Sequence, residues 1–512
     1  MKKVKGILLF VSVLLFLALC SGEVFAAVNS PLALPDLPAA LTDGDETTAI
    51  SAAELSVSSP MKMAYLYLEF YRSPCDAVLT VAQKSVTVKG EYLHQLIDIS
   101  ALFGGGQKEI TLLFGEPTEL AEITAFAAGN LPDWVEKWDA PCEKADLLLF
   151  STHADDEHLF FAGVLPTYAG EKKLAVQVVT FVDHRKEPVR LHELLAGLWK
   201  AGVRHYPVIG PFCDLYSRSA EGARAGLRST GFAVEDAEAF QVEMLRRFQP
   251  LVVLGHDPAG EYGHGQHILN ALTLTRSVPS AADPARFPES AEKYGVWDTP
   301  KLYLHSYGQN TVTLDWDRPL AAFGGKSAFQ VSQEAFACHV TQQGTMFSTW
   351  MNGANGEITS ATQIETYSPC HFGLYRTLVG EDTMGGDFFE NLTPRTVADK
   401  EKAPEEVAEE ETVKTPSRLS TGAVYAIVLP VFALFLYGIF LFPRRREKIR
   451  EFFRTLPQRL RALPGRIRAL PAKTVALAGR IKRDVPQAVR RGKERAGRLI
   501  GNLKKRIENL KK

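Results

Sequence analysis

Two short clusters of histidines and carboxylates stand more than a hundred residues apart in this chain. Residues 153–157 have the sequence His-Ala-Asp-Asp-Glu, and residues 262–267 have the sequence Tyr-Gly-His-Gly-Gln-His. Imidazoles and carboxylates are the usual ligands of a catalytic zinc ion, which takes three protein ligands and keeps one position open. The two clusters supply three ligands and leave a carboxylate over as a base, so they predict hydrolysis at a metal.

The spacing within each cluster indicates a role for each side chain. His153 and Asp156 lie three residues apart at a predicted turn from a strand into a helix, so both can point into one crevice. His267 follows the second predicted strand and completes a set of three ligands. Asp155 then remains free to accept a proton. His264, one helical turn before His267, would lie on the same face and stabilise an oxyanion or protonate a leaving amine.

The elements that must position these clusters alternate between strand and helix. Four apolar runs are typical of buried strands: residues 145–150, 175–182, 206–209 and 251–254. Three helix-like segments lie between them: residues 156–169, 189–201 and 235–247. Further strands at residues 302–305 and 311–314 and a helix at 327–340 are expected in this domain, and residues 372–376 are expected to close its folded part. This alternation predicts an α/β domain with a parallel sheet, which binds ligands beyond the carboxyl ends of its strands, where both clusters stand.

An all-β domain is expected ahead of the α/β domain, over residues 27–142. Short β-type runs separated by turn residues, such as the three glycines at 104–106, are typical of a β-sandwich. Residues 41–48 resemble the start of a discoidin-like, galactose-binding-type sandwich, which implies a sugar-binding module. A structural spacer is the open alternative.

The two clusters resemble the motifs of the LmbE-like, or PIG-L, de-N-acetylases. Members of this family remove acetyl groups from N-acetylglucosaminyl substrates with zinc, in a Rossmann-like α/β fold. The resemblance covers residues 145–270 and implies a deacetylase domain over residues 143–395. It implies the same roles as the spacing: zinc ligands His153, Asp156 and His267, the general base Asp155, and the electrostatic or acid partner His264.

The resemblance also assigns three residues to the substrate. Tyr262 would polarise the acetyl carbonyl, and Arg190 and Asp214 would contact the sugar. Simple packing is the alternative for Tyr262, and an ion pair with Glu193 or a helix-capping role is the alternative for Arg190. His339 and Gln342 either line the site or lie at the surface, and His158 and His184 are expected to be structural or exposed.

The chain departs from the family pattern at two positions. The family usually has proline at the position of Ala154, and its loss should loosen the turn without removing a ligand. The family often has aspartate at the position of Gln266. Gln266 can form hydrogen bonds but cannot raise the basicity of His264 with a charge, so the rate or the pH optimum could differ.

The two ends of the chain predict export and membrane anchoring. Residues 1–26 have a basic start, an apolar stretch and a small-residue site, which is the layout of a cleaved secretory signal. Residues 422–442 contain no charge and, at about 1.5 Å per residue, can cross the bilayer. Three arginines follow at 444–446 and place the tail in the cytoplasm by the positive-inside rule. The catalytic part would then lie outside the cell membrane, on a single-pass protein.

Charge is divided unevenly along the chain. The net charge is −1, but residues 444–512 contain 24 Lys and Arg against 5 Asp and Glu. An acidic linker at residues 396–421 is expected to be disordered because it has little to bury. The basic tail, residues 443–512, has prolines at seven-residue spacing and is interpreted as short amphipathic turns on anionic lipid. Nucleic-acid binding is disfavoured because the tail has no aromatic stacking pattern.

Five cysteines remain after the signal segment: Cys75, Cys142, Cys213, Cys338 and Cys370. Pairs such as Cys75–Cys142 or Cys338–Cys370 would be compatible with an exported protein. The odd number leaves at least one cysteine without a partner in the monomer.

These features predict an exported, membrane-anchored, zinc-dependent de-N-acetylase of a cell-envelope or extracellular glycan. Two alternatives stay open: a surface glycan-binding protein with a vestigial metal site, and a zinc amidohydrolase that acts on a non-sugar amide. Two imidazoles and one carboxylate suit zinc, although iron or cobalt would also bind.

Overall fold

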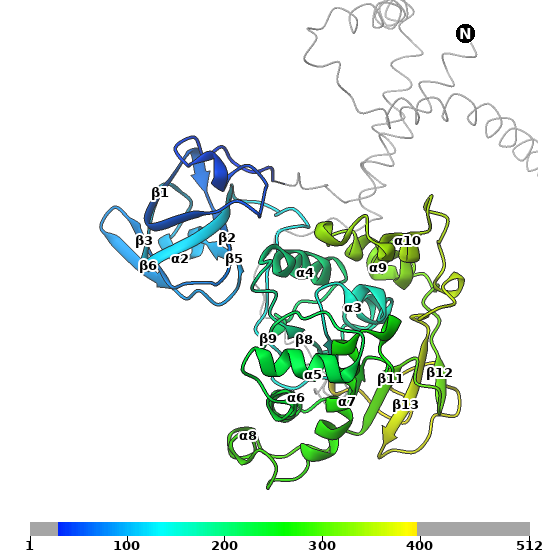
Figure 1. The fold of residues 1–512 in the computed structure, drawn as a ribbon. Coiled ribbons are helices and arrows are strands. Elements are labelled where there is room, and N and C mark those ends of the chain that lie inside the picture. The colour runs from blue at the N-terminus through cyan, green and yellow to red at the C-terminus, as the bar shows by residue number, and fades with distance from the viewer. Residues whose placement is uncertain (1–28, 397–512) are drawn as a thin grey trace, which may run out of the picture. The chain divides into compact units, whose positions relative to one another are not determined.

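The computed structural model describes residues 29–396 of the 512-residue chain (Figure 1). The predicted signal, residues 1–26, lies outside the described residues, as do the linker beyond residue 396, the membrane segment 422–442 and the basic tail. Within residues 29–396, no helix is long and apolar enough to cross a membrane. All five cysteines of this part are free thiols, so neither of the possible disulfides is formed.

The first part of the chain is an antiparallel β-domain, as the sequence predicts. Its strands are β1 (Ile50–Met63), β2 (Tyr65–Phe70), β3 (Ala77–Val81), β4 (Lys84–Val88), β5 (His94–Asp98) and β6 (Gln107–Phe126). They form one connected sheet in the order β4-β3-β6-β2-β5, with β1 also paired to β6. The strands that were predicted to form a sandwich are joined here in one hydrogen-bonded sheet. The reason is the length of β6, which pairs with β3 through its first half and with β2 through its second half.

The second part is an α/β domain around a seven-stranded sheet. Its strands are β7 (Leu147–Ser151), β8 (Val176–Val182), β9 (Val208–Phe212), β10 (Val252–Gly255), β11 (Lys301–His305), β12 (Thr311–Thr313) and β13 (His371–Thr377). The order is β12-β13-β11-β10-β7-β8-β9. The five strands from β9 to β11 are parallel, which the sequence predicted for β7, β8, β9 and β10. β13 runs antiparallel to β11 and to β12, so the sheet is mixed at this edge.

Helices cover both faces of this sheet (Figure 1). They are α3 (Asp156–Leu159), α4 (Val189–Lys200), α5 (Ala220–Ser229), α6 (Val234–Phe248), α7 (Gly265–Ser280), α8 (Pro288–Tyr294), α9 (Ala328–Phe336) and α10 (Met346–Asn352). Successive residues of a strand point to opposite faces. Leu147 and Leu149 of β7 therefore share a core with α4 and α9, while Leu148 and Phe150 share another core with α6 and α7.

The predicted helix over residues 156–169 is broken in the structure. α3 ends at Leu159, and a separate π-helical turn spans Pro166–Glu171. Gly163 between them has a φ of 90°, which a right-handed helix does not allow, and Pro166 cannot donate a helical hydrogen bond. The break keeps α3 short and places its first turn directly beneath the end of β7.

A buried polar contact joins the β-domain to α4. His94 Nε2 of β5 lies 2.9 Å from His192 Nδ1 of α4, and His94 Nδ1 lies 2.8 Å from Glu136 Oε2. Trp138 Nε1 donates to the same oxygen of Glu136 at 2.7 Å.

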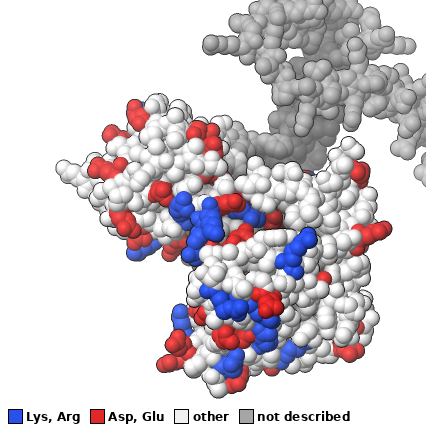
Figure 2. Space-filling model, viewed as in Figure 1, with Lys and Arg blue, Asp and Glu red and all other residues white. Residues whose placement is uncertain are grey.

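On the face that Figure 2 presents, Lys and Arg side chains are mixed with Asp and Glu side chains over both parts.

Candidate functional site

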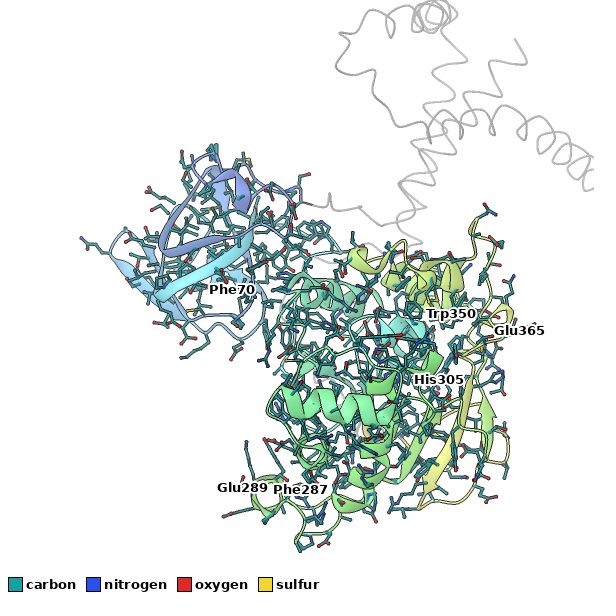
Figure 3. All side chains as sticks on the ribbon, in the orientation of Figure 1. Phe70, Phe287, Glu289, His305, Trp350 and Glu365 are labelled. Atoms are coloured by element: carbon teal, nitrogen blue, oxygen red, sulfur yellow. The ribbon has the colours of Figure 1, made fainter. Side chains whose placement is uncertain are left out.

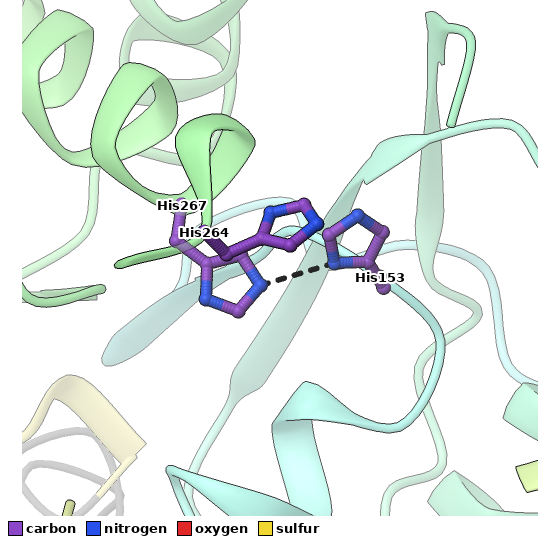
Figure 4. A group of neighbouring side chains, drawn as sticks. All are labelled: His153, His264 and His267. Carbon is purple, nitrogen blue, oxygen red and sulfur yellow. Dashed lines mark hydrogen bonds between the residues drawn. The ribbon is translucent and has the colours of Figure 1, made fainter. Parts of the chain in front are cut away.

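Three side chains from the two clusters meet beyond the carboxyl end of β7. His153 follows β7, Asp156 begins α3, and His267 lies in the first turn of α7. His153 Nδ1 is 3.1 Å from His267 Nε2, the contact drawn in Figure 4, and Asp156 Oδ2 is 3.3 Å from each of these nitrogens. Ligand atoms around a tetrahedral zinc ion lie roughly 3.3 Å apart when the bonds are about 2.0 Å long. The three donors thus have the spacing that a zinc ion requires.

The charges at this point favour a cation. Burial lowers the pKa of His153, but the carboxylates of Asp156 and Asp214 outweigh it and raise this pKa to about 10. Burial likewise lowers the pKa of His267, but Asp156 and Glu261 raise it to about 9. The surrounding carboxylates therefore stabilise positive charge where the three donors meet. The donor set, its spacing and this field all fit a divalent metal ion.

Glu261 orients the histidine ligand of α7 from behind. Its Oε2 accepts hydrogen bonds from His267 Nδ1 at 2.8 Å and His256 Nδ1 at 2.9 Å, and its Oε1 accepts one from His305 Nδ1 at 2.7 Å. Burial raises the pKa of Glu261, but these three histidines hold it well below the usual range. A carboxylate on the far nitrogen of a ligating histidine fixes the ring and increases its basicity.

Three residues of the site, Glu261, His256 and His305, were not predicted from the sequence. His256 directly follows β10 and His305 ends β11 (labelled in Figure 3), so both stand at carboxyl ends of strands, as His153 does. That position was the available signal. His256 Nε2 accepts the Thr152 N–H at 3.0 Å, which uses the lone pair that a metal would need. His256 therefore supports the site rather than completing it.

Asp155 is held beside the three donors without joining them. Its φ is 141°, a conformation that non-glycine residues rarely adopt, and its N–H donates to Glu157 Oε2 at 3.0 Å. Its Oδ2 lies 3.6 Å from Arg190 Nη2. Burial, with the neighbouring Asp156 carboxylate, raises the pKa of Asp155 to about 7. A carboxyl group in this state can accept and release a proton near neutral pH.

Arg190 pairs with Asp214, not with Glu193. Its Nη1 lies 3.3 Å from Asp214 Oδ2, and its Nη2 donates to Ala154 O at 2.7 Å. Asp214 Oδ1 is 3.5 Å from His153 Nε2, and the Asp214 side chain is 37% exposed. Burial raises the pKa of Asp214, but His153, His184 and Arg190 hold it well below its usual range. Asp214 is thus an ionised acceptor that solvent or a substrate can reach.

His264 and Tyr262 flank the three donors. The His264 ring centroid is 4.7 Å from those of His153 and His267, and its Nδ1 is buried with no hydrogen-bond partner in residues 29–396. Burial, with repulsion from His153 and His267, lowers the pKa of His264 to about 3, so the ring is neutral. The Tyr262 ring lies 5.4 Å from His264, and it also packs 5.3 Å from Phe347.

The two departures from the family pattern have structural roles. The Ala154 N–H donates to His184 Nε2 at 2.9 Å, a bond that proline cannot make. Gln266 Oε1 lies 3.2 Å from His153 Nε2 and also accepts the Leu215 N–H at 2.8 Å. Gln266 therefore orients His153, and not His264 as the sequence suggested. The bond leaves His153 Nδ1 directed at the other donors.

His158, His184 and His339 are all buried. His184 supports the loop after β7 through Ala154, in agreement with a structural role. His339 does not lie at the surface: it is buried, and its Nε2 lies 3.1 Å from Glu157 Oε1. Gln342 follows it in the turn Val340–Gln342 and donates from its side chain to Thr341 Oγ1.

No family model matches the chain. The chain is 26% identical over 193 residues to the 1D-myo-inositol 2-acetamido-2-deoxy-alpha-D-glucopyranoside deacetylase of Streptomyces scabiei, a match that covers 34% of this chain and 59% of that protein. It is 29% identical over 213 residues to deacetylase 2 of the same description from Saccharopolyspora erythraea, covering 36% and 73%. The N,N'-diacetylchitobiose deacetylase structure from Pyrococcus horikoshii is 14% identical, covers 46% and 86%, and has a TM-score of 0.33. The chain spans less than two thirds of the Streptomyces scabiei relative.

Proposed function

We propose that this chain, which belongs to the LmbE-like, or PIG-L, family, is a metal-dependent de-N-acetylase of N-acetylglucosamine-containing substrates. The main support is the meeting of His153 Nδ1, His267 Nε2 and Asp156 Oδ2 within 3.3 Å of one another, with Asp155 beside them. The descriptions of the Streptomyces scabiei and Saccharopolyspora erythraea relatives name a deacetylase of a 2-acetamido-2-deoxyglucopyranoside, which supports the substrate class.

His153, Asp156 and His267 would hold the metal ion. When bound, a zinc ion acts as a Lewis acid that polarises the acetamide carbonyl and makes water more acidic. Asp156 Oδ2 also accepts a hydrogen bond from the backbone N–H of His153 at 2.7 Å. Gln266 orients the His153 ring, and Glu261 orients the His267 ring. The ligand set is therefore fixed before a metal binds, which favours tight binding.

Asp155 would act as the general base. Its carboxylate accepts a proton from the attacking water, whose oxygen bonds to the acetamide carbon. The C–N bond then breaks, and the amine leaves with the proton that Asp155 had accepted, so the products are acetate and a free amino sugar. The strained backbone at Asp155 and its hydrogen bond to Glu157 hold the carboxylate next to the ligands.

His264 and Tyr262 would stabilise the oxyanion that forms on the acetamide oxygen. The Nδ1 atom of His264 is without a partner in the described part of the chain, so the ring is available for such a hydrogen bond. Asp214 would accept a hydrogen bond from a hydroxyl group of the sugar, because its carboxylate is partly exposed and lies beside His153. Arg190 would position Asp214 through their ion pair.

We also propose an exported, single-pass membrane protein with the deacetylase part outside and the basic tail on the inner leaflet. The support is the sequence of residues 1–26, the uncharged apolar segment 422–442 and the arginines that follow it. Protease treatment of intact cells should degrade the deacetylase part and spare an epitope placed at the C-terminus. Equal protection of both parts would contradict this topology.

The deciding experiment measures acetate release by the full-length chain. The substrates are N-acetylglucosamine oligosaccharides, peptidoglycan fragments and N-acetylated non-sugar amines, each with and without added zinc. His267→Ala, which removes one proposed ligand, is the control variant. Zinc-dependent release from the sugars, lost in the control, supports the proposal. Release only from non-sugar amides would identify a different amidohydrolase, and metal and glycan binding without any release would identify a glycan-binding protein.

A further inference from the structure

A second cluster of side chains that could bind a metal ion lies around Glu157, two residues after Asp155. Glu157, His158 and His339 are completely buried, and they offer one carboxylate oxygen and two imidazole nitrogens within 4.8 Å of one another. Glu157 and His158 belong to α3, and His339 follows α9. Two imidazoles and one carboxylate are the same donor types as those of His153, His267 and Asp156.

The polar atoms of this cluster have no hydrogen-bond partners within residues 29–396. They are Glu157 Oε1, both ring nitrogens of His158 and both ring nitrogens of His339. Buried polar atoms are nearly always satisfied, because an unpaired one is costly in a medium without water. Five such atoms in three neighbouring side chains indicate that a ligand belongs among them.

The geometry matches a cation better than a hydrogen-bonded pair. His339 Nε2 lies 3.1 Å and His158 Nε2 lies 3.5 Å from Glu157 Oε1, close to the roughly 3.3 Å between ligands of a tetrahedral zinc ion. Both nitrogens approach this oxygen closely, and neither forms a hydrogen bond of good geometry within residues 29–396. A cation among the three donors would satisfy them together.

Gly197 of α4 packs closely against both imidazoles. A Cβ atom added there would lie 2.7 Å from His158 Nε2 and 3.0 Å from His339 Nε2. Both nitrogens therefore lie close to the α4 backbone, and any side chain at residue 197 would collide with the two imidazoles.

We propose that Glu157, His158 and His339 bind a second divalent cation of the zinc class. The ion would also act on the deacetylase site, because Glu157 Oε2 accepts the Asp155 N–H at 3.0 Å. Fixing Glu157 from behind holds the backbone of Asp155 in its strained conformation. Glu157 and His339 are then positioning residues for Asp155, and the ion does not touch the substrate.

The test counts metal ions in the full-length chain. The protein is loaded with zinc, dialysed against metal-free buffer and analysed by mass spectrometry for zinc per chain. We expect two equivalents in the wild type and one in His339→Leu. One equivalent is also expected in His267→Ala, which loses only the ion of the deacetylase site. In cobalt-loaded His267→Ala, the visible absorption of a tetrahedral cobalt ion should persist. This absorption should vanish in the double variant that combines His267→Ala with His339→Leu.

His94→Gln is the matched control, since His94 belongs to another group of Glu and His side chains, with the half-buried Glu46 and the buried Glu69 and His192. Both ions should remain in this variant. One equivalent in the wild type, lost entirely in His267→Ala, would overturn the proposal. So would a second ion that survives His339→Leu and disappears in His94→Gln. If His339→Leu does not fold, Glu157→Gln replaces it, because glutamine keeps an oxygen for the Asp155 N–H. These counts are independent of whether any acetate is released.

Discussion

Glu261 accepts a hydrogen bond from His267 Nδ1 at 2.8 Å, and this bond directs the opposite nitrogen of the ring at Asp156 Oδ2, 3.3 Å away. Glu261 lies directly before the second cluster, and all of its side chain is buried. It therefore links the loop after β10 to the proposed metal ligands. The orientation of His267 depends on this carboxylate rather than on the helix that carries the histidine.

Glu261→Gln should weaken zinc binding by about 10- to 100-fold, the usual effect of losing a carboxylate behind a ligating histidine. Glutamine can still accept hydrogen bonds from His267 and His256, but it lacks the negative charge that makes the His267 ring more basic. Zinc affinity is measured by competition with a chromophoric chelator. His305→Gln is the control, because among the contacts of Glu261 it changes only the one to Oε1 and leaves those to His267 and His256, so it should affect affinity less. Equal losses in both variants would contradict a specific role for the His267 contact.

Asp155→Asn should bind zinc as tightly as the wild type and lose about 10²- to 10⁴-fold in kcat, the range expected for loss of a general base. The amide still fits the buried site but cannot accept the proton of water. Steady-state acetate release and zinc content are measured on the same preparation. Full turnover by a zinc-loaded Asp155→Asn protein would remove Asp155 from the mechanism.

The sequence predicted the donors of the site better than their supports. His153, Asp156 and His267 stand next to strand ends that their own neighbours in the sequence reveal. His256 follows a strand and His305 ends one, but their relation to Glu261 depends on the order of strands in the sheet. β10 lies between β7 and β11, and no local pattern specifies that order. Supports that come from separate strands are therefore visible only once the sheet is assembled.

The fold shows the same division between local and distant effects. The alternation of apolar runs with amphipathic segments predicted the parallel core of the α/β domain. The short strands of the β-domain were predicted, but their joining in one sheet was not, because β6 extends over 20 residues and pairs with strands that lie apart in the sequence. The helix predicted over residues 156–169 was too long, because the spacing of apolar residues does not reveal that Gly163 adopts a positive φ.

Gly265→Ala should lower kcat/KM by about 100-fold, the cost of moving catalytic groups by roughly 1 Å. Gly265 begins α7 against a neighbouring loop, and a Cβ there would lie 1.9 Å from Ser217 Oγ and 2.4 Å from Ser219 O. The start of the helix must shift, and His264 and His267 shift with it. Gly115→Ala is the control, since a Cβ at that position meets nothing within 4 Å. A Gly265→Ala enzyme with wild-type kcat/KM would show that α7 tolerates the displacement.

A buried carboxyl group of the β-domain should make stability depend on pH. Glu69 of β2 is buried, and no hydrogen bond to its side chain is formed within the described part of the chain. Burial raises the pKa of Glu69 to about 7, with the nearby His94 opposing and Glu46 adding to the shift. The folded state therefore holds a proton that the unfolded chain, with a pKa near 4.5, releases earlier.

Glu69→Gln should remove a loss of stability that the wild type shows between about pH 4.5 and pH 7. Below this range both states carry the proton, and above it the folded state must bury a charge. The raised pKa therefore costs the wild type about 3 kcal/mol at pH 8 relative to pH 4, at 1.36 kcal/mol per pKa unit. Thermal unfolding of the full-length chain is measured in the presence of a metal chelator. The increase in stability of Glu69→Gln over the wild type should be smaller at pH 4.5 than at pH 8. Glu116→Gln, at an exposed site, should change neither value, and an equal gain from Glu69→Gln at both pH values would show that Glu69 titrates normally.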